Sequence, residues 1–430
     1  MTTAGVHPAA LPAAASVTPA RLIVALVALR WLAGIADNMG ARGASEAAAV
    51  AMLAALGLML LNRMRLARDA ALLMTGLLAW LFTGTLSALS TDMARPIEAA
   101  ALLTLLLLYA LFANAALTYL RQPAALVPLR RFLTAFVAVG GALALVQVLS
   151  GSAFVDPGKP GVIRAFGSDV HPVSFAIQML AALLALEVIR AKTGERFGAG
   201  HVALLALGAA ALYLTFARTA WVMALVVLAL LAWRRGRGAQ RLALVALALP
   251  LGIVGLTVSD RFADLSSLPL FWQNFSFADT VFDYRYIDNS VSWRIVNWSY
   301  GLQQAMEQPL LGFGPGQSAD ASHFNLEMHN LLLEGFFEGG VLGLTALLVT
   351  LAGLVRIHLR LPNATPADAY ARALAGGFGP ALLFAVLFST SLVDQLMTVL
   401  MYLILLAVAG TPAEAPPKTR PLSWLPPGSP

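Results

Sequence analysis

The sequence predicts an all-α integral membrane protein with about twelve transmembrane helices and one long external loop that carries short helices. Of its 430 residues, 59% are hydrophobic and only 12% are charged, whereas about a quarter of the residues in a soluble domain are charged. Apolar runs of roughly 20 residues, the length that a helix needs to cross a bilayer, recur along the chain. The basic residues between these runs are divided unevenly between the two sides, as in multi-pass membrane proteins.

The pattern divides the chain into two flexible ends, two groups of helices and a loop. Residues 1–19 lack the charged and apolar regions of a signal peptide and predict a flexible cytoplasmic N-terminus. Nine helices are expected in residues 20–258 and three in 333–410, with a periplasmic loop over 259–332 between them. The proline-rich residues 411–430 predict a flexible cytoplasmic tail. The expected spans are 20–36, 45–61, 69–88, 98–119, 132–150, 172–190, 200–217, 219–233, 242–258, 333–355, 373–392 and 395–410.

The seventh and eighth spans are divided at Arg218. A single helix over residues 200–233 would be about 50 Å long, which exceeds a bilayer core of about 30 Å. With twelve spans and both termini in the cytoplasm, the cytoplasmic loops hold 16 Lys and Arg residues and the opposite loops hold eight. The positive-inside rule therefore supports twelve spans and places residues 259–332 outside, which is the periplasmic side if the source is a Gram-negative bacterium.

The loop over 259–332 is acidic and rich in aromatic residues. Its aromatic side chains fit either an interfacial belt or a surface that stacks against sugar rings. Residues 290–307 alternate apolar and polar positions roughly as a helix does, with Ser290 or Ser292 as N-cap and Pro309 beyond the end.

The stretch over residues 310–343 has the strongest functional pattern. A turn with Gly312, Gly314 and Gly316 is followed by a polar segment, by His329-Asn330 and by an apolar run that contains Glu338. Ionisable groups at membrane depth are costly and usually face a partner or a cavity. The three glycines are expected to let the backbone pass close to a bulky substrate. We therefore interpret this stretch as the active site, with Asn330, Glu338, Gly314 and Gly316 as supporting residues.

His329 is the expected catalytic residue, because histidine acts as base or acid near neutral pH and His329 lies where the loop becomes a helix. Glu334 and Glu338 follow on the helix and are expected to tune or orient the imidazole. Taken alone, such a histidine is more often structural. Of the other external histidines, His171 fits a helix start and His323 fits a solvated loop.

Three external arginines are expected to bind phosphate, because a guanidinium binds phosphate oxygens in a bidentate manner. Arg218 lies at the tight turn in an otherwise apolar stretch, where capping of helix carbonyls is the alternative. Arg294 lies among tryptophans, which also fits a cation–π contact, and Arg164 is a weaker candidate. No metal or other cofactor is expected, since the chain has no cysteine and the loop carboxylates lack a metal-loop spacing.

These residues resemble the O-antigen ligase and O-antigen polymerase superfamily. The resemblance rests on G-x-G-x-G, a polar gap and then H-N-x-x-L-x-x-x-x-E-x-G-x-x-G, together with the segments around Arg218 and Arg294. The motif residues are Gly312, Gly314, Gly316, His329, Asn330, Leu333, Glu338, Gly340 and Gly343.

The resemblance implies a glycosyltransferase with an undecaprenyl-diphosphate-linked donor and, for a ligase, a lipid A–core acceptor. The enzyme would lie in the bacterial inner membrane. His329 would be the base of an inverting, metal-independent transfer, and arginines would stabilise the diphosphate.

Two alternatives remain open at this stage. A polymerase of the same chemistry would lengthen the glycan on its lipid carrier. A polysaccharide or lipid transporter would place ionisable residues inside its spans and show internal repeats. Arg30 and Glu187 lie in or near spans, but the sequence shows no convincing repeat.

Overall fold

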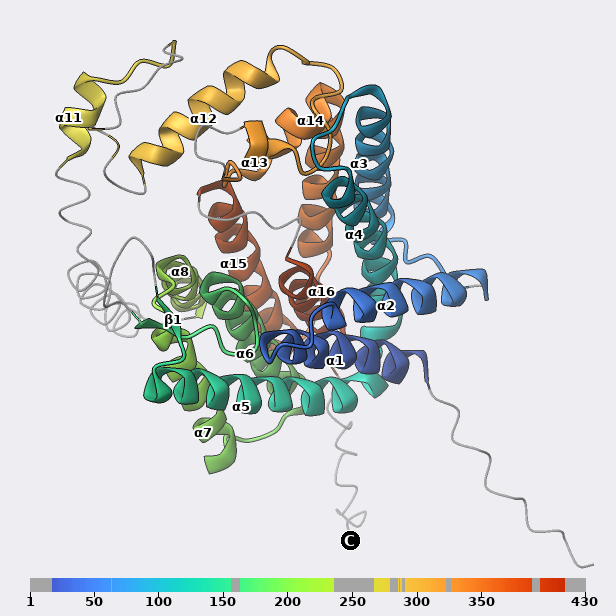
Figure 1. The fold of residues 1–430 in the computed structure, drawn as a ribbon. Coiled ribbons are helices and arrows are strands. Elements are labelled where there is room, and N and C mark those ends of the chain that lie inside the picture. The colour runs from blue at the N-terminus through green and yellow to red at the C-terminus, as the bar shows by residue number, and fades with distance from the viewer. Residues whose placement is uncertain are drawn as a thin grey trace, which may run out of the picture.

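The structure is a computed structural model, and it describes residues 18–62, 64–155, 163–235, 267–278, 285, 287, 291–321, 326–388 and 395–413. It is an all-α membrane protein (Figure 1), and in these ranges eight helices are long and apolar enough to cross a membrane. They are α1 (Pro19–Asn38), α2 (Ala44–Leu61), α3 (Ala71–Ser90), α4 (Pro96–Ala115) continued by the π-helical η1 (Ala116–Leu120), α5 (Leu126–Ser150) preceded by the 3-10 turn η2 (Pro123–Ala125), α6 (Pro172–Thr193), α14 (Leu331–Leu359) and α15 (Pro366–Phe388).

Three shorter apolar helices are α7 (Ala199–Leu214), α8 (Arg218–Arg235) and α16 (Leu396–Gly410). Eleven of the predicted spans thus fall on described helices, and α7 and α8 are separate, as the position of Arg218 predicted. The ninth predicted span, residues 242–258, lies outside the described residues. The count of twelve and the periplasmic position of the loop stay predictions.

Short elements connect the long helices. The two-residue strands β1 (Phe154–Val155) and β2 (Ile163–Arg164) pair antiparallel. The predicted loop contains α11 (Leu268–Gln273), α12 (Ser292–Ala305) and α13 (Ser318–Ala321). In Figure 1, α12 and α13 lie at the end of the molecule where α14 begins. The helix predicted over residues 290–307 is confirmed, but Ser292 as its N-cap is wrong, because Ser292 is already helical and Val291 is at the cap position. Ser290 lies outside the described residues.

Helices α3 and α14 pack closely through small residues. A Cβ atom at Gly76 of α3 would lie 2.4 Å from the Thr350 nitrogen, and one at Gly353 of α14 would lie 2.5 Å from the Leu73 Cα atom. Glycine at both positions lets the backbones approach, which is the usual way in which helices associate tightly inside a membrane. This packing fixes α14, whose first turn follows His329.

Helix α14 is interrupted near its start at Gly340, where φ is 60° and ψ is −158°. Chain from the preceding loop fills the break, since Val341 donates a hydrogen bond to the Pro309 carbonyl at 2.8 Å. A Cβ atom at Gly340 would lie 2.3 Å from the Leu310 carbonyl oxygen. The kink therefore ties the turn that begins at Leu310 to the helix that follows His329.

Candidate active site

Asn330 begins α14 and thereby fixes the place of His329. Its side-chain Oδ1 accepts hydrogen bonds from the Leu332 and Leu333 backbone nitrogens, each at 3.1 Å. This is the standard N-cap arrangement, in which a side-chain oxygen satisfies the otherwise free amides of the first turn. His329, one residue earlier, has a φ of 52°, a left-handed conformation that is uncommon for a residue other than glycine. Such strained positions are concentrated at functional sites.

The imidazole of His329 is held by the chain just before it. Its Nδ1 atom lies 2.8 Å from the Glu327 carbonyl oxygen. A carbonyl oxygen only accepts, so in the neutral ring Nδ1 carries the proton and Nε2 keeps its lone pair. Burial lowers the pKa of His329 below its ordinary value, the Glu327 hydrogen bond opposes this shift, and the charge of Arg294 adds to it. The ring is therefore a neutral base near pH 7.

Glu334 supports His329 through the backbone. Its side chain is buried, and Oε1 accepts a hydrogen bond from the His329 backbone nitrogen at 3.1 Å. The expected effect of Glu334 and Glu338 on the imidazole thus takes a different form. Glu334 holds the main chain of His329, whereas Glu338 Oε1 accepts from the Gly316 nitrogen at 3.0 Å and so belongs to the glycine turn.

Helix α12 supports the same segment from the other side. The Trp293 ring meets the His329 ring edge to face, with centroids 5.3 Å apart, and the Arg294 guanidinium carbon lies 5.0 Å from the Trp293 ring centroid. Further along α12, Trp298 Nε1 donates to the Met328 carbonyl at 2.6 Å. The Arg294 charge therefore acts on His329. The predicted cation–π contact of Arg294 is also present, with Trp293 as its partner.

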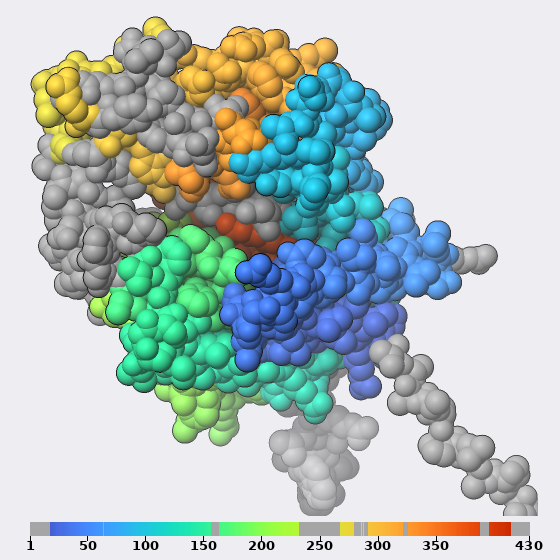
Figure 2. All heavy atoms as spheres, viewed as in Figure 1, coloured from blue at the N-terminus to red at the C-terminus, as the bar shows by residue number. Residues whose placement is uncertain are grey.

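A polar cavity of about 650 Å³ opens beside His329. Figure 2 shows a recess between the blue and green surfaces below and the orange surface above. The wall of the polar cavity includes Arg30 and Asp37 of α1. It also includes Asp169, His171 and Gln178 around the start of α6, together with Glu327 and His329. Cavities of this size with a few convergent polar groups are typical of binding sites.

Arg164 and Arg218 lie at a different place, the turn between α7 and α8. Arg164 Nε donates to the Thr215 carbonyl at 3.0 Å, and Arg218 is the first residue of α8. Phe216, which lies between Thr215 and Arg218 in this turn, has a left-handed φ of 48°. Neither arginine is among the described residues that line the cavity with His329. The predicted arginines thus form two groups, Arg294 beside the base and this pair at the turn.

The glycine turn packs against protein rather than leaving room for a ligand. A Cβ atom at Gly312 would lie 2.4 Å from the Phe337 carbonyl oxygen, one at Gly314 would lie 3.1 Å from the Met93 sulfur, and one at Gly316 would lie 3.3 Å from Leu102. All three have positive φ, at 69°, 99° and 75°. The expectation that these glycines leave space for a substrate is therefore corrected, because protein atoms occupy that space.

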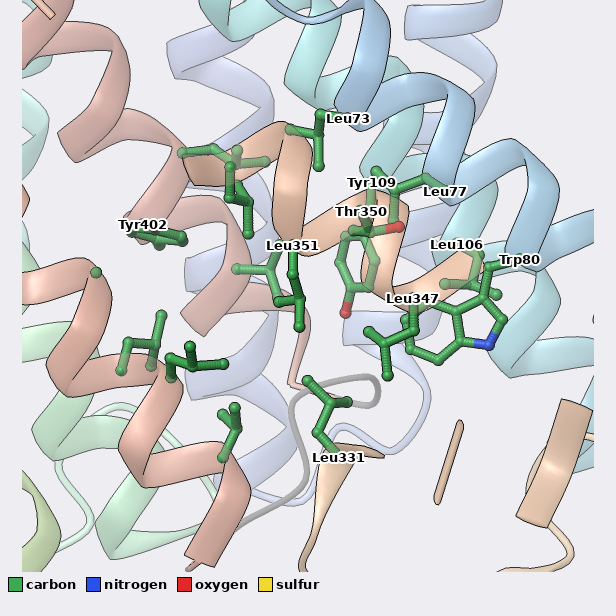
Figure 3. Close-up of a pocket in the computed structure, with 17 residues that line it drawn as sticks. Leu73, Leu77, Trp80, Leu106, Tyr109, Leu331, Leu347, Thr350, Leu351 and Tyr402 are labelled. Atoms are coloured by element: carbon green, nitrogen blue, oxygen red, sulfur yellow. The ribbon is translucent and has the colours of Figure 1, made fainter. Parts of the chain in front are cut away.

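A second, apolar cavity of about 120 Å³ lies among α3, α4, α14, α15 and α16. Figure 3 shows its lining, with leucines, Trp80 and the hydroxyl-bearing Tyr109 and Tyr402 around it. Leu331, two residues after His329, is part of its wall. The start of α14 thus separates a polar cavity from an apolar one.

Sequence reasoning missed two features of this site. Arg30 looked like an isolated charge in an apolar helix, and its presence in a span was the one available signal. Asp169 gave no signal, and it faces the cavity with Oδ1 accepting from the Val170 nitrogen at 2.6 Å. His323 lies outside the described residues. In the part of the chain that the structure describes, no group of three or more His, Asp or Glu residues is arranged to hold a metal ion.

Residues 203–348 match the model of a family described as O-antigen ligase. The matched region runs from α7 into α14 and contains Arg218, Arg294, the glycine turn and His329. No curated protein sequence matches the chain.

Proposed function

We propose that this chain is an O-antigen ligase, because its residues 203–348 match the family described as O-antigen ligase. It transfers a polysaccharide from undecaprenyl diphosphate to a sugar of the lipid A–core oligosaccharide. The enzyme lies in the bacterial inner membrane, with twelve spans, both termini in the cytoplasm and the active site in the periplasm. The single observation that carries the proposal is the 2.8 Å contact between His329 Nδ1 and the Glu327 carbonyl beside a cavity of about 650 Å³, because this contact favours the tautomer with a lone pair on Nε2.

His329 acts as the general base. An acceptor hydroxyl oxygen attacks the anomeric carbon of the donor sugar, and its proton passes to His329 Nε2. The bond between the anomeric carbon and the diphosphate oxygen breaks, and undecaprenyl diphosphate leaves with the electron pair. A single displacement inverts the anomeric configuration, as in inverting glycosidases.

The arginines stabilise the charge that develops on the diphosphate. We assign Arg294 to this role first, because its charge already acts on His329. Arg218 and Arg164 bind the diphosphate from the turn between α7 and α8, through the bidentate contacts that guanidinium groups make with phosphate. The donor chemistry then needs neither a nucleotide nor a metal ion.

The apolar cavity next to the start of α14 has a lining that suits the lipid part of such a donor, and its volume of about 120 Å³ admits a short segment of the isoprenoid rather than its whole length. Its wall consists of leucines and aromatic rings, and Leu331 connects it to the segment that carries His329. An isoprenoid chain in this cavity would hold the first sugar of the donor near the base. The polar cavity remains for sugars and charged groups, which need the hydrogen-bonding side chains that line it.

Transfer with purified components tests this proposal. The full-length protein in detergent is mixed with undecaprenyl-diphosphate-linked glycan and lipid A–core, with and without EDTA. We expect glycan on lipid A–core and equal rates in both reactions. A longer glycan on undecaprenyl diphosphate, with lipid A–core unchanged, would make the protein a polymerase. Activity that is lost with EDTA and restored by a divalent cation would contradict the metal-independent mechanism.

A further inference from the structure

Arg30 lies inside a membrane helix. It is eight residues from Asn38, the last residue of α1, which corresponds to about 12 Å along the helix axis. A charged side chain at such depth is costly, and it normally faces a partner or a water-filled cavity with a functional role. Its place in α1 therefore calls for a ligand or a counter-charge.

The side chain of Arg30 lines the same cavity as His329. Its Nε atom is buried and has no hydrogen-bond partner among the described residues. Gly34, one turn further along α1, also lines this cavity, and a Cβ atom there would lie 3.4 Å from Arg30 Nη1. Glycine at this position thus keeps the space beside the guanidinium open. A buried donor without an acceptor costs free energy, which a bound anion would recover.

Two carboxylates of the cavity wall, Asp37 and Asp169, accept hydrogen bonds from other groups of the protein. Asp37 accepts hydrogen bonds from the Ala44 and Ser45 nitrogens, each at 2.9 Å, and so holds the start of α2. Asp169 accepts from the Val170 and His171 nitrogens and from Gln178 Nε2. These carboxylates attract the Arg30 charge through space, but their described hydrogen bonds run to amides and a hydroxyl of the protein.

We propose that Arg30 binds an anionic oxygen of the substrate that fills this cavity, which His329 also lines. The chemical class is a phosphate, from either the donor diphosphate or a phosphate on the lipid A–core acceptor. This inference rests on the proposed transferase function, because it takes the cavity to be the place where donor and acceptor meet. A guanidinium so placed fixes the charged end of the substrate while His329 Nε2 takes the proton.

Steady-state kinetics and binding test this role with Arg30→Gln, Arg30→Lys and the control Arg21→Gln. Arg21 is an exposed arginine on the same helix, outside the cavity. For Arg30→Gln we expect the KM of one substrate to rise about ten- to a hundredfold, as for the loss of a charged hydrogen bond. Arg30→Lys recovers part of the affinity because it keeps the charge, and Arg21→Gln matches the wild type.

The substrate whose KM changes identifies the source of the phosphate. A rise for the donor, with weaker binding of purified undecaprenyl diphosphate, assigns Arg30 to the diphosphate. A rise for the acceptor that disappears when the lipid A–core is dephosphorylated assigns Arg30 to an acceptor phosphate. Unchanged KM values for both substrates in protein that accumulates normally overturn the proposal. So does the failure of both Arg30 variants to accumulate, since Arg30 would then only balance the nearby carboxylates.

Binding separates this inference from the proposed function. If the wild-type protein transfers no glycan but binds undecaprenyl diphosphate more tightly than Arg30→Gln does, the transferase assignment fails and the phosphate site stands. If the wild type transfers glycan and Arg30→Gln has unchanged KM values, the function stands and the Arg30 site fails.

Discussion

The His329 imidazole and the Glu327 carbonyl form a hydrogen bond of 2.8 Å between residues only two positions apart. The left-handed φ of His329 turns the ring back toward this carbonyl, and the Glu334 side chain holds the His329 nitrogen. The result is a neutral imidazole with one tautomer selected by the main chain. This relationship gives a histidine at a helix start a fixed position and a selected tautomer, as the proposed role of a base requires.

The acid side of the pH–rate profile is the first prediction. Burial lowers the pKa of His329, and the neutral ring is the active form, so the midpoint of the acidic limb lies below the ordinary histidine value of about 6.5. The profile is measured as kcat/KM, which reports the pKa values of the free enzyme. Arg294→Gln removes a charge that lowers this pKa, so its acidic limb moves to higher pH. A limb that lies above pH 6.5 in the wild type, or one that Arg294→Gln leaves in place, would contradict the assignment.

Glu334 is predicted to act on turnover rather than binding. In Glu334→Ala the His329 nitrogen loses its acceptor, the ring loses its position, and kcat falls about ten- to a hundredfold with KM nearly unchanged. Glu334→Gln retains an acceptor oxygen and keeps most of the activity. Steady-state rates of the two variants are compared with Glu307→Ala, which changes an exposed carboxylate. Equal loss in the Ala and Gln variants would show that the charge of Glu334 is what matters.

Arg218 is predicted to be needed for transfer while the protein still accumulates. Arg218→Ala loses most activity because the diphosphate loses a bidentate donor, and Arg218→Lys recovers only part because lysine lacks the fork. Arg196→Ala, an exposed arginine in another loop, is the control. The amount of protein in the membrane is measured beside the rate. If Arg218→Ala is absent from the membrane, Arg218 instead caps the end of α7.

The glycine turn is predicted to be structural. In Gly312→Ala the new Cβ atom would lie 2.4 Å from the Phe337 carbonyl oxygen, at a position whose φ is 69°. We therefore expect the free energy of unfolding to fall by about 2 kcal/mol or more. Gly57→Ala is the matched control, because nothing lies within 4 Å of the new atom and α2 continues through it. Thermal unfolding in detergent compares the two. Equal melting temperatures, with activity lost in Gly312→Ala alone, would contradict the structural role and show that this turn takes part in substrate binding.

The sequence predicted the existence of the helices better than their ends. Apolar runs reveal the part of a helix that lies in hydrocarbon, so the expected start at residue 132 missed the first turns of α5, which begins at Leu126 and contains Arg130. Helix α15 likewise begins at Pro366 rather than 373, because its first turns carry Asp368. Charged residues in these first turns lower the hydropathy by which a span is recognised, although the chain is already helical there.

The site was predictable where it is local in sequence. The place of His329, where the loop becomes a helix, follows from residue identity and spacing, whereas the N-cap role of Asn330 and the helix start at Leu331 were not predicted. The cavity does not, because its wall joins α1, the start of α6 and the start of α16 across more than 300 residues. The left-handed conformation of His329 and the packing of Gly312 also depend on three-dimensional neighbours, so no local pattern reveals them.

Transfer by the His329→Ala variant tests the central claim most directly. The wild type, His329→Ala and the control His201→Gln are purified, and transfer to lipid A–core is measured beside binding of undecaprenyl diphosphate. The account predicts a loss of about a hundred- to ten-thousandfold in the rate of His329→Ala, the range for a general base, with lipid binding retained and His201→Gln active. Near-normal turnover of His329→Ala would contradict it and assign the proton transfer to another group.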